Sequence, residues 1–348
     1  MTRRVPITDQ TVADSSNSSV ISSDHPMAGY RFIFLGGLHR SGTTPLFYLL
    51  RDHPSVSGFR FSQGAEKEHE GQFHQTVYPT TYKTGGPGCF CLNDEAYFDE
   101  KSRLVNRANA ERLFSEWSTH WDLSKAYLLE KSPPNLIRTR FLQRLFPNAY
   151  FVMIVRHPVA VSLATMKWMG WPKHVLTPSR DVNGGPLFTI RPADRSDNQA
   201  FHESKQLFME SMLFTLLEHW RLGHARYLED APFLAKSVLI RYEDFVSDPD
   251  NTTSELFEFL DLPAAHPDRQ EAISSHNDRY FDEWLSMPTD VLTPECRQFL
   301  NGRFEEFVSQ FGYSLSDVTR ITRSGREKRE PASYPQRQHS PTGRSRNT

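Results

Sequence analysis

The chain has 348 residues, with 40 Lys and Arg against 42 Asp and Glu, and 38% of its residues are hydrophobic. This composition is typical of a globular protein with a sizeable core, and it excludes a metal-dependent miniature fold. The net charge of -2 excludes a global positive field that would attract nucleic acid or an anionic membrane, so any anion must be bound by a local arrangement.

The chain begins with a polar, serine-rich segment over residues 1–28, which we expect to form a disordered arm because it carries too little apolar surface to fold. The sequence contains no apolar stretch of the length needed for a membrane span or the core of a secretory signal. Its three cysteines, Cys89, Cys91 and Cys296, are too few for a disulfide framework. These features together predict a cytoplasmic protein in a reducing compartment.

Strand and helix patterns then alternate along the chain. Four apolar runs rich in Val, Ile and Phe predict strands covered on both faces, at 31–37, 127–131, 150–156 and 237–245. Each is followed by a predicted helix, at 45–52, 135–146, 159–169 and 252–260. Further helices are predicted at 106–121, 203–228 and 294–311. The alternation predicts an α/β fold, with a parallel β-sheet flanked by helices in three layers.

Two segments interrupt this alternation. Residues 62–93 and 170–198 are rich in Gly, Pro and polar residues, and both are longer than the usual connection of about 2–6 residues. Long excursions from a rigid sheet commonly carry substrate sites and lids. We therefore expect these two segments, with the helix at 106–121, to shape an acceptor pocket.

The C-terminal residues 320–348 are strongly basic and predict a second disordered segment, which leaves one folded domain over residues 29–319. No metal site is predicted. Cys89 and Cys91 lie two residues apart without further ligands at a workable spacing. His69 and His74 are five residues apart, so they would not share one face of a helix as zinc-protease histidines do.

The first strand ends in a glycine turn that runs directly into a helix. Gly37 and Gly42, with four residues between them, match the glycine spacing of a phosphate-binding P-loop, in which free amides and a helix N-terminus hold the anion. Two threonines follow Gly42 where an ATP-type loop has lysine, and the cation Arg40 precedes it. Without that lysine, transfer of a γ-phosphoryl group is disfavoured, and a phosphate that bears another group is favoured.

Four motifs occur in order at strand ends: RSGTT, LLEKSPPN, VRHPVAVSLA and IRYEDFVSDP. In this order they resemble the sulfotransferases that use 3′-phosphoadenosine 5′-phosphosulfate (PAPS), over about residues 30–312. The RSGTT form resembles the branch with the tyrosylprotein and carbohydrate enzymes more than the cytosolic phenol type. The resemblance implies a P-loop, sulfotransferase-like fold, with PAPS as the donor and no metal required.

The resemblance also implies which residues hold the 5′-phosphosulfate of PAPS: Arg40, Ser41, Gly42, Thr43 and Thr44. The chemistry agrees, because backbone amides and hydroxyls can surround the anion while Arg40 supplies a bidentate cation. Transfer of the sulfuryl group leaves charge on the phosphate, and preorganised donors at that position lower the barrier.

At the other end of the donor, the resemblance implies that Arg156 binds the 3′-phosphate and that Tyr242 lies against the adenine. The family serine would lie eight residues after the arginine, but this chain has Ala164 there. Ser162 or Thr165 is the alternative ligand. Ser162 could equally bond to its own helix backbone, and Tyr242 could instead be a core residue.

Lys131 ends an apolar strand, and the resemblance implies that it reaches the bridging oxygen or the departing phosphate. In the phenol enzymes a catalytic histidine follows that lysine by two residues, where this chain has Pro133. The base must therefore come from elsewhere. The tyrosylprotein-type enzymes use a glutamate after the first strand and helix, which favours Glu70 here, with His69 next. The register leaves other candidates open, namely Glu66, Glu68 and His74.

The sequence thus predicts an enzyme that moves a sulfuryl group from PAPS to an acceptor hydroxyl and releases 3′-phosphoadenosine 5′-phosphate (PAP). The expected acceptor is a small molecule, a lipid headgroup or a glycan, and nucleic acid is not an expected partner. Two alternatives remain open, a P-loop kinase dependent on ATP and Mg²⁺ and an inactive nucleotide-binding scaffold. The sequence does not indicate an oligomeric state.

Overall fold

The structure is a computed structural model, and it describes residues 19–59, 70–170, 174–180, 186–192, 205–263 and 277–321. A five-stranded parallel sheet runs through the centre, in the order β2-β3-β1-β4-β7. Its strands are β1 (Arg31–Gly37), β2 (Val56–Gly58), β3 (Tyr127–Lys131), β4 (Ala149–Val155) and β7 (Ser237–Arg241). β1 lies between β3 and β4, so the segments that leave these three strands start side by side at one edge of the sheet.

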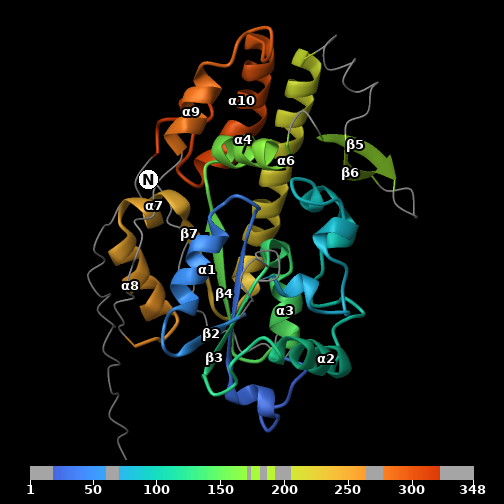
Figure 1. Ribbon diagram of the computed structural model, residues 1–348, viewed down its shortest axis with the longest axis vertical. Helices are drawn as coiled ribbons and strands as arrows, with labels where there is room; N and C mark the ends of the chain where they lie inside the picture. The colour runs from blue at the N-terminus through green and yellow to red at the C-terminus, as the bar shows by residue number, and fades with distance from the viewer. Residues whose placement is uncertain are drawn as a thin grey trace, which may run out of the picture.

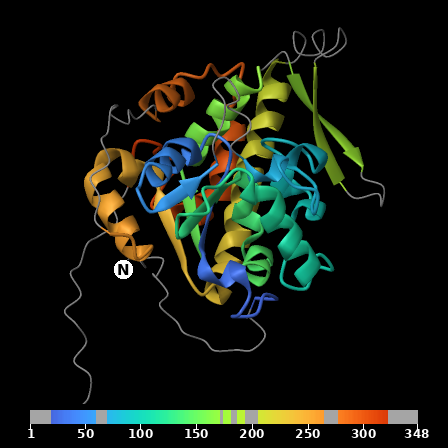
Figure 2. The ribbon, with the colours of Figure 1, turned by 60° about the horizontal axis from the view of Figure 1, so that its bottom comes forward.

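Alternate residues of β1 face opposite sides of the sheet, and each side has its own core. Ile33 and Leu35 belong to one core, which is covered by α1 (Thr43–Arg51), α7 (Tyr242–Ser247) and α8 (Pro249–Phe259). Phe32 and Phe34 belong to the other. This second core is covered by α2 (Arg107–Ser118), α3 (Thr139–Leu145), α4 (Pro158–Trp168), α6 (Lys205–Asp230) and α10 (Pro294–Ser309). Figure 2 shows α8 and α2 on opposite sides of the sheet, and the three-layer α/β prediction is confirmed.

One end of the molecule is built from α4, α9 (Asn277–Leu285), α10 and the adjoining part of α6. They form the upper part of Figure 1. A separate antiparallel hairpin, β5 (His174–Arg180) with β6 (Pro186–Pro192), lies beside α6 in the same figure. This hairpin accounts for part of the second predicted excursion. The first excursion contains only short 3₁₀ turns among its described residues.

Most predicted elements are confirmed to within three residues, and β1 and β3 have the predicted bounds. The single helix predicted at 135–146 is wrong. A 3₁₀ turn, Pro133–Ile137, comes first, and α3 starts only after Arg138, whose backbone is not helical and whose guanidinium donates to two loop carbonyl oxygens. The strand predicted at 237–245 is wrong beyond Arg241, because α7 begins at Tyr242 with two acidic residues in its first turn, where they favour a helix.

The N-terminal arm is shorter than predicted. Met27 is fully buried in the 3₁₀ turn Pro26–Gly29, and the amide of Val20 donates to the carbonyl oxygen of Arg144. The polar composition of residues 1–28 as a whole gave no indication that Met27 would be buried. The expectations of disorder for residues 1–18 and 322–348 lie outside the described residues.

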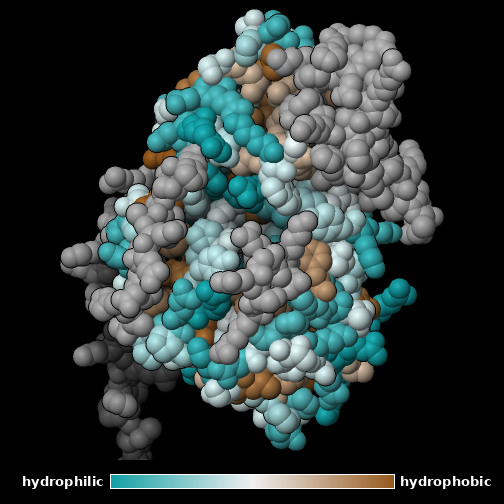
Figure 3. Space-filling model, viewed as in Figure 1, coloured by the Kyte–Doolittle hydropathy of each residue, from teal (hydrophilic) through white to brown (hydrophobic). Residues whose placement is uncertain are grey.

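The face seen in Figure 3 is mostly hydrophilic, and its hydrophobic side chains lie in small separate areas. Among the described residues, no helix is both long enough and apolar enough to cross a membrane.

Candidate active site

The loop between β1 and α1 has the backbone of an anion-binding turn. Arg40 and Gly42 have left-handed backbone angles, with φ of 67° and 101°. A Cβ atom at Gly42 would lie 2.5 Å from the ring of Tyr242, so both conformation and space require glycine there. Gly42 caps α1 without a side-chain hydrogen bond, and the first-turn amides of Thr43 and Thr44 have no partner inside the helix. These amides can therefore receive an anion.

Ser41 and Arg40 play different parts in this loop. Ser41 is fully buried, and its hydroxyl and its amide both donate to the carbonyl oxygen of Leu38, at 2.6 and 3.1 Å. Both hydrogen-bond donors of Ser41 are therefore used inside the loop, where they stabilise its conformation. The side chain of Arg40 is exposed and makes no ion pair or hydrogen bond with any described residue. Within the described part of the chain, nothing competes with an anion for its guanidinium.

Arg156 lies directly after β4, and two of its three guanidinium nitrogens make hydrogen bonds to described residues. Its Nε donates to Asn277 Oδ1 at 2.8 Å, and its Nη1 donates to the carbonyl oxygen of Arg40 at 2.9 Å. Its Nη2 is buried and has no hydrogen-bond partner in the described part of the chain. The hydroxyl of Ser162, on α4, is buried in the same unpartnered condition. Burial lowers the pKa of Arg156, although a guanidinium stays charged near neutral pH.

Tyr242 packs beneath the loop. Its ring is only 5% exposed, lies under Gly42 and carries the guanidinium of Arg156 at 4.3 Å from the ring centre. The structure therefore uses Tyr242 as a platform for the loop and for Arg156. Thr43 is buried at the start of α1 and Thr44 is partly exposed, whereas Ala164 and Thr165 are buried on α4.

The structure brings Glu70 and Lys131 together. Lys131 Nζ lies 3.0 Å from Glu70 Oε1, and Gln72 Nε2 donates to Glu70 Oε2 at 2.6 Å. Both charged side chains are largely shielded from solvent. Burial alone raises the pKa of Glu70, but attraction to Lys131 and to His39 and the hydrogen bonds from Lys131 and Gln72 outweigh it. The pKa of Glu70 is therefore below its ordinary value, and Glu70 is a carboxylate at neutral pH.

The segment that carries Glu70 is docked on the end of β3. The amide of Gly71 donates to Glu130 Oε1 at 2.8 Å, and the amide of Gln72 donates to Ser132 Oγ at 3.1 Å. A Cβ atom at Gly71 would lie 2.6 Å from Glu130 Cγ, so a larger residue there would force the Glu130 side chain or the docked segment to shift. Burial raises the pKa of Glu130 to about 7, against hydrogen bonds from Ser132, Asn135 and Gly71.

His39, inside the phosphate loop, lies beside the candidate site and is not among the residues predicted from the sequence. Its ring stacks on Trp168 at 5.5 Å and meets the edge of Phe90, and its buried Nδ1 has no hydrogen-bond partner among the described residues. Burial lowers its pKa to about 4, so the imidazole is neutral near pH 7. Its position beside Arg40 in the sequence is the only local signal that points to it.

The other proposed bases are Glu66, Glu68, His69 and His74. Glu66, Glu68 and His69 lie outside the described residues. His74 packs its ring against His120, with ring centres 4.2 Å apart, and against Phe59. Within the described residues, no three His, Cys, Asp or Glu side chains are arranged to hold a metal ion.

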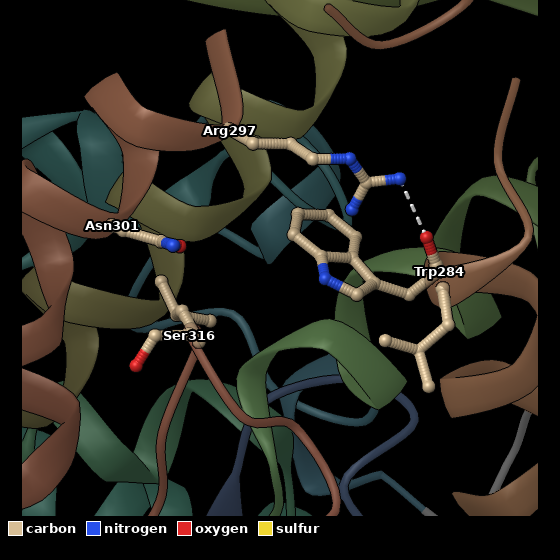
Figure 4. A pocket seen from close by; sticks show the side chains of 6 residues that line it. Trp284, Arg297, Asn301 and Ser316 are labelled. Atoms are coloured by element: carbon tan, nitrogen blue, oxygen red, sulfur yellow. Dashed lines mark hydrogen bonds between the residues drawn. The ribbon is translucent and has the colours of Figure 1, made fainter. Parts of the chain in front are cut away.

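A pocket of about 280 Å³ lies elsewhere, between α9, α10 and the segment after α10. Figure 4 shows Arg297 over the indole of Trp284, with its guanidinium donating to the Trp284 carbonyl oxygen at 2.7 Å. None of the predicted site residues lines this pocket. The candidate site is therefore the cluster at the carboxyl ends of the strands.

Residues 33–184 match the sulfotransferase family, and no curated protein matches the chain. A sulfotransferase structure from Alicyclobacillus acidocaldarius is 17% identical, with a TM-score of 0.42 over 80% of this chain and 92% of that chain. One from Mycobacterium avium is 13% identical, with a TM-score of 0.41 over 83% and 80%. A retinol dehydratase in complex with androsterone and PAP is 14% identical, with a TM-score of 0.28 over 75% and 67%.

Proposed function

Because residues 33–184 match the sulfotransferase family, we propose that this chain is a member of that family and that its site moves a sulfuryl group from PAPS to an acceptor hydroxyl. PAPS-dependent sulfuryl transfer is the general activity of that family.

The strongest support comes from two buried polar groups, Arg156 Nη2 and Ser162 Oγ, which have no hydrogen-bond partner among the described residues. A buried donor or acceptor that makes no hydrogen bond costs about 1–3 kcal/mol, and a bound ligand is one way to satisfy it. We assign both to the 3′-phosphate of PAPS. This choice favours Ser162 over Thr165 as the ligand that stands in for the family serine.

At the 5′ end, we assign the amides of Thr43 and Thr44 and the guanidinium of Arg40 to the phosphosulfate. The amides point out of the first turn of α1, and Arg40 has no competing partner among the described residues. Ser41 holds the loop in shape through Leu38. Tyr242 is too deeply buried for us to assign it to the adenine.

The chemistry needs a base and a cation, and the pair of Glu70 and Lys131 supplies them. When PAPS is bound, a bond forms from the acceptor oxygen to sulfur as the bond from sulfur to the 5′-phosphate oxygen breaks, which leaves PAP. Glu70 accepts the proton of the acceptor hydroxyl. Lys131 and Arg40 stabilise the charge that grows on the phosphate. As Lys131 turns from Glu70 to the phosphate, Glu70 loses its nearest positive charge and becomes a stronger base.

The surroundings of Glu70 favour an acceptor with an apolar or ring-shaped body. Tyr82 lies near enough to Glu70 that burial and the Glu70 charge raise its pKa. Tyr82 is 57% exposed and contacts the ring of Phe73. Trp168, stacked on His39, is 45% exposed. We therefore propose that the acceptor is a hydroxyl of a small molecule, a lipid or a glycan.

We also propose that this chain belongs to the branch with the tyrosylprotein and carbohydrate enzymes. All three cysteines are free thiols, which favours a reducing compartment such as the cytoplasm.

The test is thermal unfolding of the full chain with PAP, with adenosine 5′-phosphate (AMP) and with ATP plus Mg²⁺. We expect PAP to raise the Tm by several degrees, because a ligand of the native state at 100 times its Kd adds about 2.7 kcal/mol. Arg156→Lys removes most of the PAP effect, whereas Arg107→Ala, at an exposed arginine on α2, leaves it unchanged. A response to ATP with Mg²⁺ alone would favour the kinase and overturn the proposal.

A further inference from the structure

The guanidinium of Arg156 is held by two hydrogen bonds and one ring, so its direction is set. Nε is fixed by Asn277 Oδ1 and Nη1 by the carbonyl oxygen of Arg40, while the plane lies over Tyr242. A guanidinium is planar, with its five N–H groups in a rigid fork. Once two corners are fixed, the direction of the unpartnered Nη2 follows.

Asn277 reaches Arg156 from 121 residues further along the chain and is itself fixed from behind. It is the first residue of α9 and only 2% exposed. Its Oδ1 accepts from Arg156, and its Nδ2 donates to Glu243 Oε1 at 2.7 Å. The cation on one side and the carboxylate on the other permit only one orientation of the amide.

Glu243, which holds the Asn277 amide, is itself held in place by two further hydrogen-bond donors. Its Oε1 also accepts from the amide of His157 at 3.0 Å, and its Oε2 accepts from the hydroxyl of Tyr313 at 2.5 Å. Burial and the charge of Glu243 raise the pKa of Tyr313, so the phenol keeps its proton and donates. The chain of contacts therefore runs from Tyr313 through Glu243 and Asn277 to Arg156.

We propose that Asn277 is a positioning residue that makes the site selective for a donor with a 3′-phosphate, with Glu243 and Tyr313 as its supports. This inference rests on the proposed function. Asn277 acts through Arg156, by aiming Nη2 at the phosphate. The first helix after the 264–276 segment thereby contributes to donor recognition.

Asn277 tests this role more cleanly than Arg156 does. Arg156 also holds the carbonyl oxygen of Arg40, in the left-handed part of the loop, so its removal disturbs both ends of the donor. Loss of Asn277 leaves that second hydrogen bond in place. Its effect should therefore appear only with ligands that carry a 3′-phosphate.

The experiment measures the Kd of the full chain for PAP and for AMP, which lacks the 3′-phosphate, in the wild type and in Asn277→Ala. We expect the Kd for PAP to rise about tenfold, the equivalent of one misplaced hydrogen bond to a charged group, and the Kd for AMP to change less than about twofold. Tyr313→Phe, which removes one hydroxyl, should raise the Kd for PAP about two- to threefold. It also keeps the test open if Asn277→Ala fails to fold.

Asn93→Ala is the matched control, because Asn93 is a buried asparagine at the start of another short helix. It should leave the ratio of the two Kd values unchanged. Equal weakening of PAP and AMP in Asn277→Ala, or no weakening of PAP, would overturn the positioning role. A wild type that binds PAP and AMP equally would instead overturn the proposed function.

Discussion

The phosphate loop and the segment that carries Glu70 meet at the same edge of the sheet, yet they are built in different ways. In the loop, Ser41 bonds to Leu38, three residues away, and Gly42 leads straight into α1. Gly71 and Gln72 instead bond to Glu130 and Ser132, which lie 59 and 60 residues away. The phosphate loop is therefore a local structure, whereas the position of Glu70, the proposed base, is fixed only when distant strands are assembled.

This difference separates donor binding from chemistry. Changes in the docked segment should lower turnover and spare the binding of PAP, while changes in the loop should affect both. Lys131, at the end of β3, pairs with Glu70 and in the proposed mechanism also stabilises the leaving phosphate, so it links the two regions. The following substitutions use this separation.

The largest effect is expected for Lys131→Ala. The substitution removes a cation from the leaving phosphate and leaves Glu70 without its ion-pair partner, so kcat should fall about 10³-fold. The initial rate of PAP formation at saturating acceptor measures it. Lys83→Ala, at an exposed lysine, is the control and should keep the wild-type rate. A Lys131→Ala enzyme with more than a tenth of the wild-type kcat contradicts the mechanism.

Gly71→Ala is the sharpest test of the docked segment. Its Cβ would meet the Glu130 side chain at 2.6 Å, and because Glu130 is buried and held by three hydrogen bonds, we expect residues 70–72 to shift and Glu70 to move with them. We expect kcat to fall about 10²-fold, as displacements of about 1 Å can cause, with the Kd for PAP unchanged.

Gly302, on α10, provides the matched glycine, because a Cβ there meets nothing within 4 Å. Gly302→Ala should keep the wild-type kcat and add up to about 1 kcal/mol of stability, as alanine does in a helix. If Gly71→Ala weakens PAP binding as much as it lowers kcat, the two regions are not separable.

Glu130 makes the stability of the docked region depend on pH. Its pKa is raised from 4.5 to about 7 by burial, so the folded chain holds a proton that the unfolded chain releases. The stabilisation is complete below about pH 4.5 and is lost as the pH rises to 7, by up to about 3 kcal/mol.

Urea unfolding at several pH values measures this effect. Glu130→Gln should flatten the decline between pH 4.5 and 7, because its amide does not titrate. Glu70, whose pKa is lowered, has the opposite sign, so Glu70→Gln should alter the pH dependence only below the ordinary carboxyl range. An unchanged decline in Glu130→Gln would assign the effect to another group.

The smallest effect is expected for His39→Phe, which keeps an aromatic ring against Trp168. With Glu70 as the base, kcat should change less than about threefold, as measured by PAP formation at saturating acceptor. A loss of more than about 30-fold, with Glu70→Gln nearly active, would transfer the role of base to the neutral imidazole of His39.

Prediction from the sequence succeeded where neighbours along the chain decide the structure. The bounds of β1 and β3 follow from continuous apolar runs, and the loop follows from the spacing of Gly37 and Gly42. It failed at α9, which was not predicted at all, and at the break before α3. There Arg138 leaves the helical conformation, and its buried guanidinium donates to carbonyl oxygens far away in the sequence. No local sequence pattern predicts such a contact.

The sequence by itself determined the α/β fold, the phosphate loop and the identities of Arg40, Lys131 and Arg156 as candidate cations, because apolar periodicity and glycine spacing act over a few residues. Only the tertiary structure decided which groups face them. Glu70 meets Lys131, and Asn277 meets Arg156, through contacts that span 61 and 121 residues. Such pairs depend on how the strands are ordered and on which buried groups lack partners, and both are properties of the assembled core.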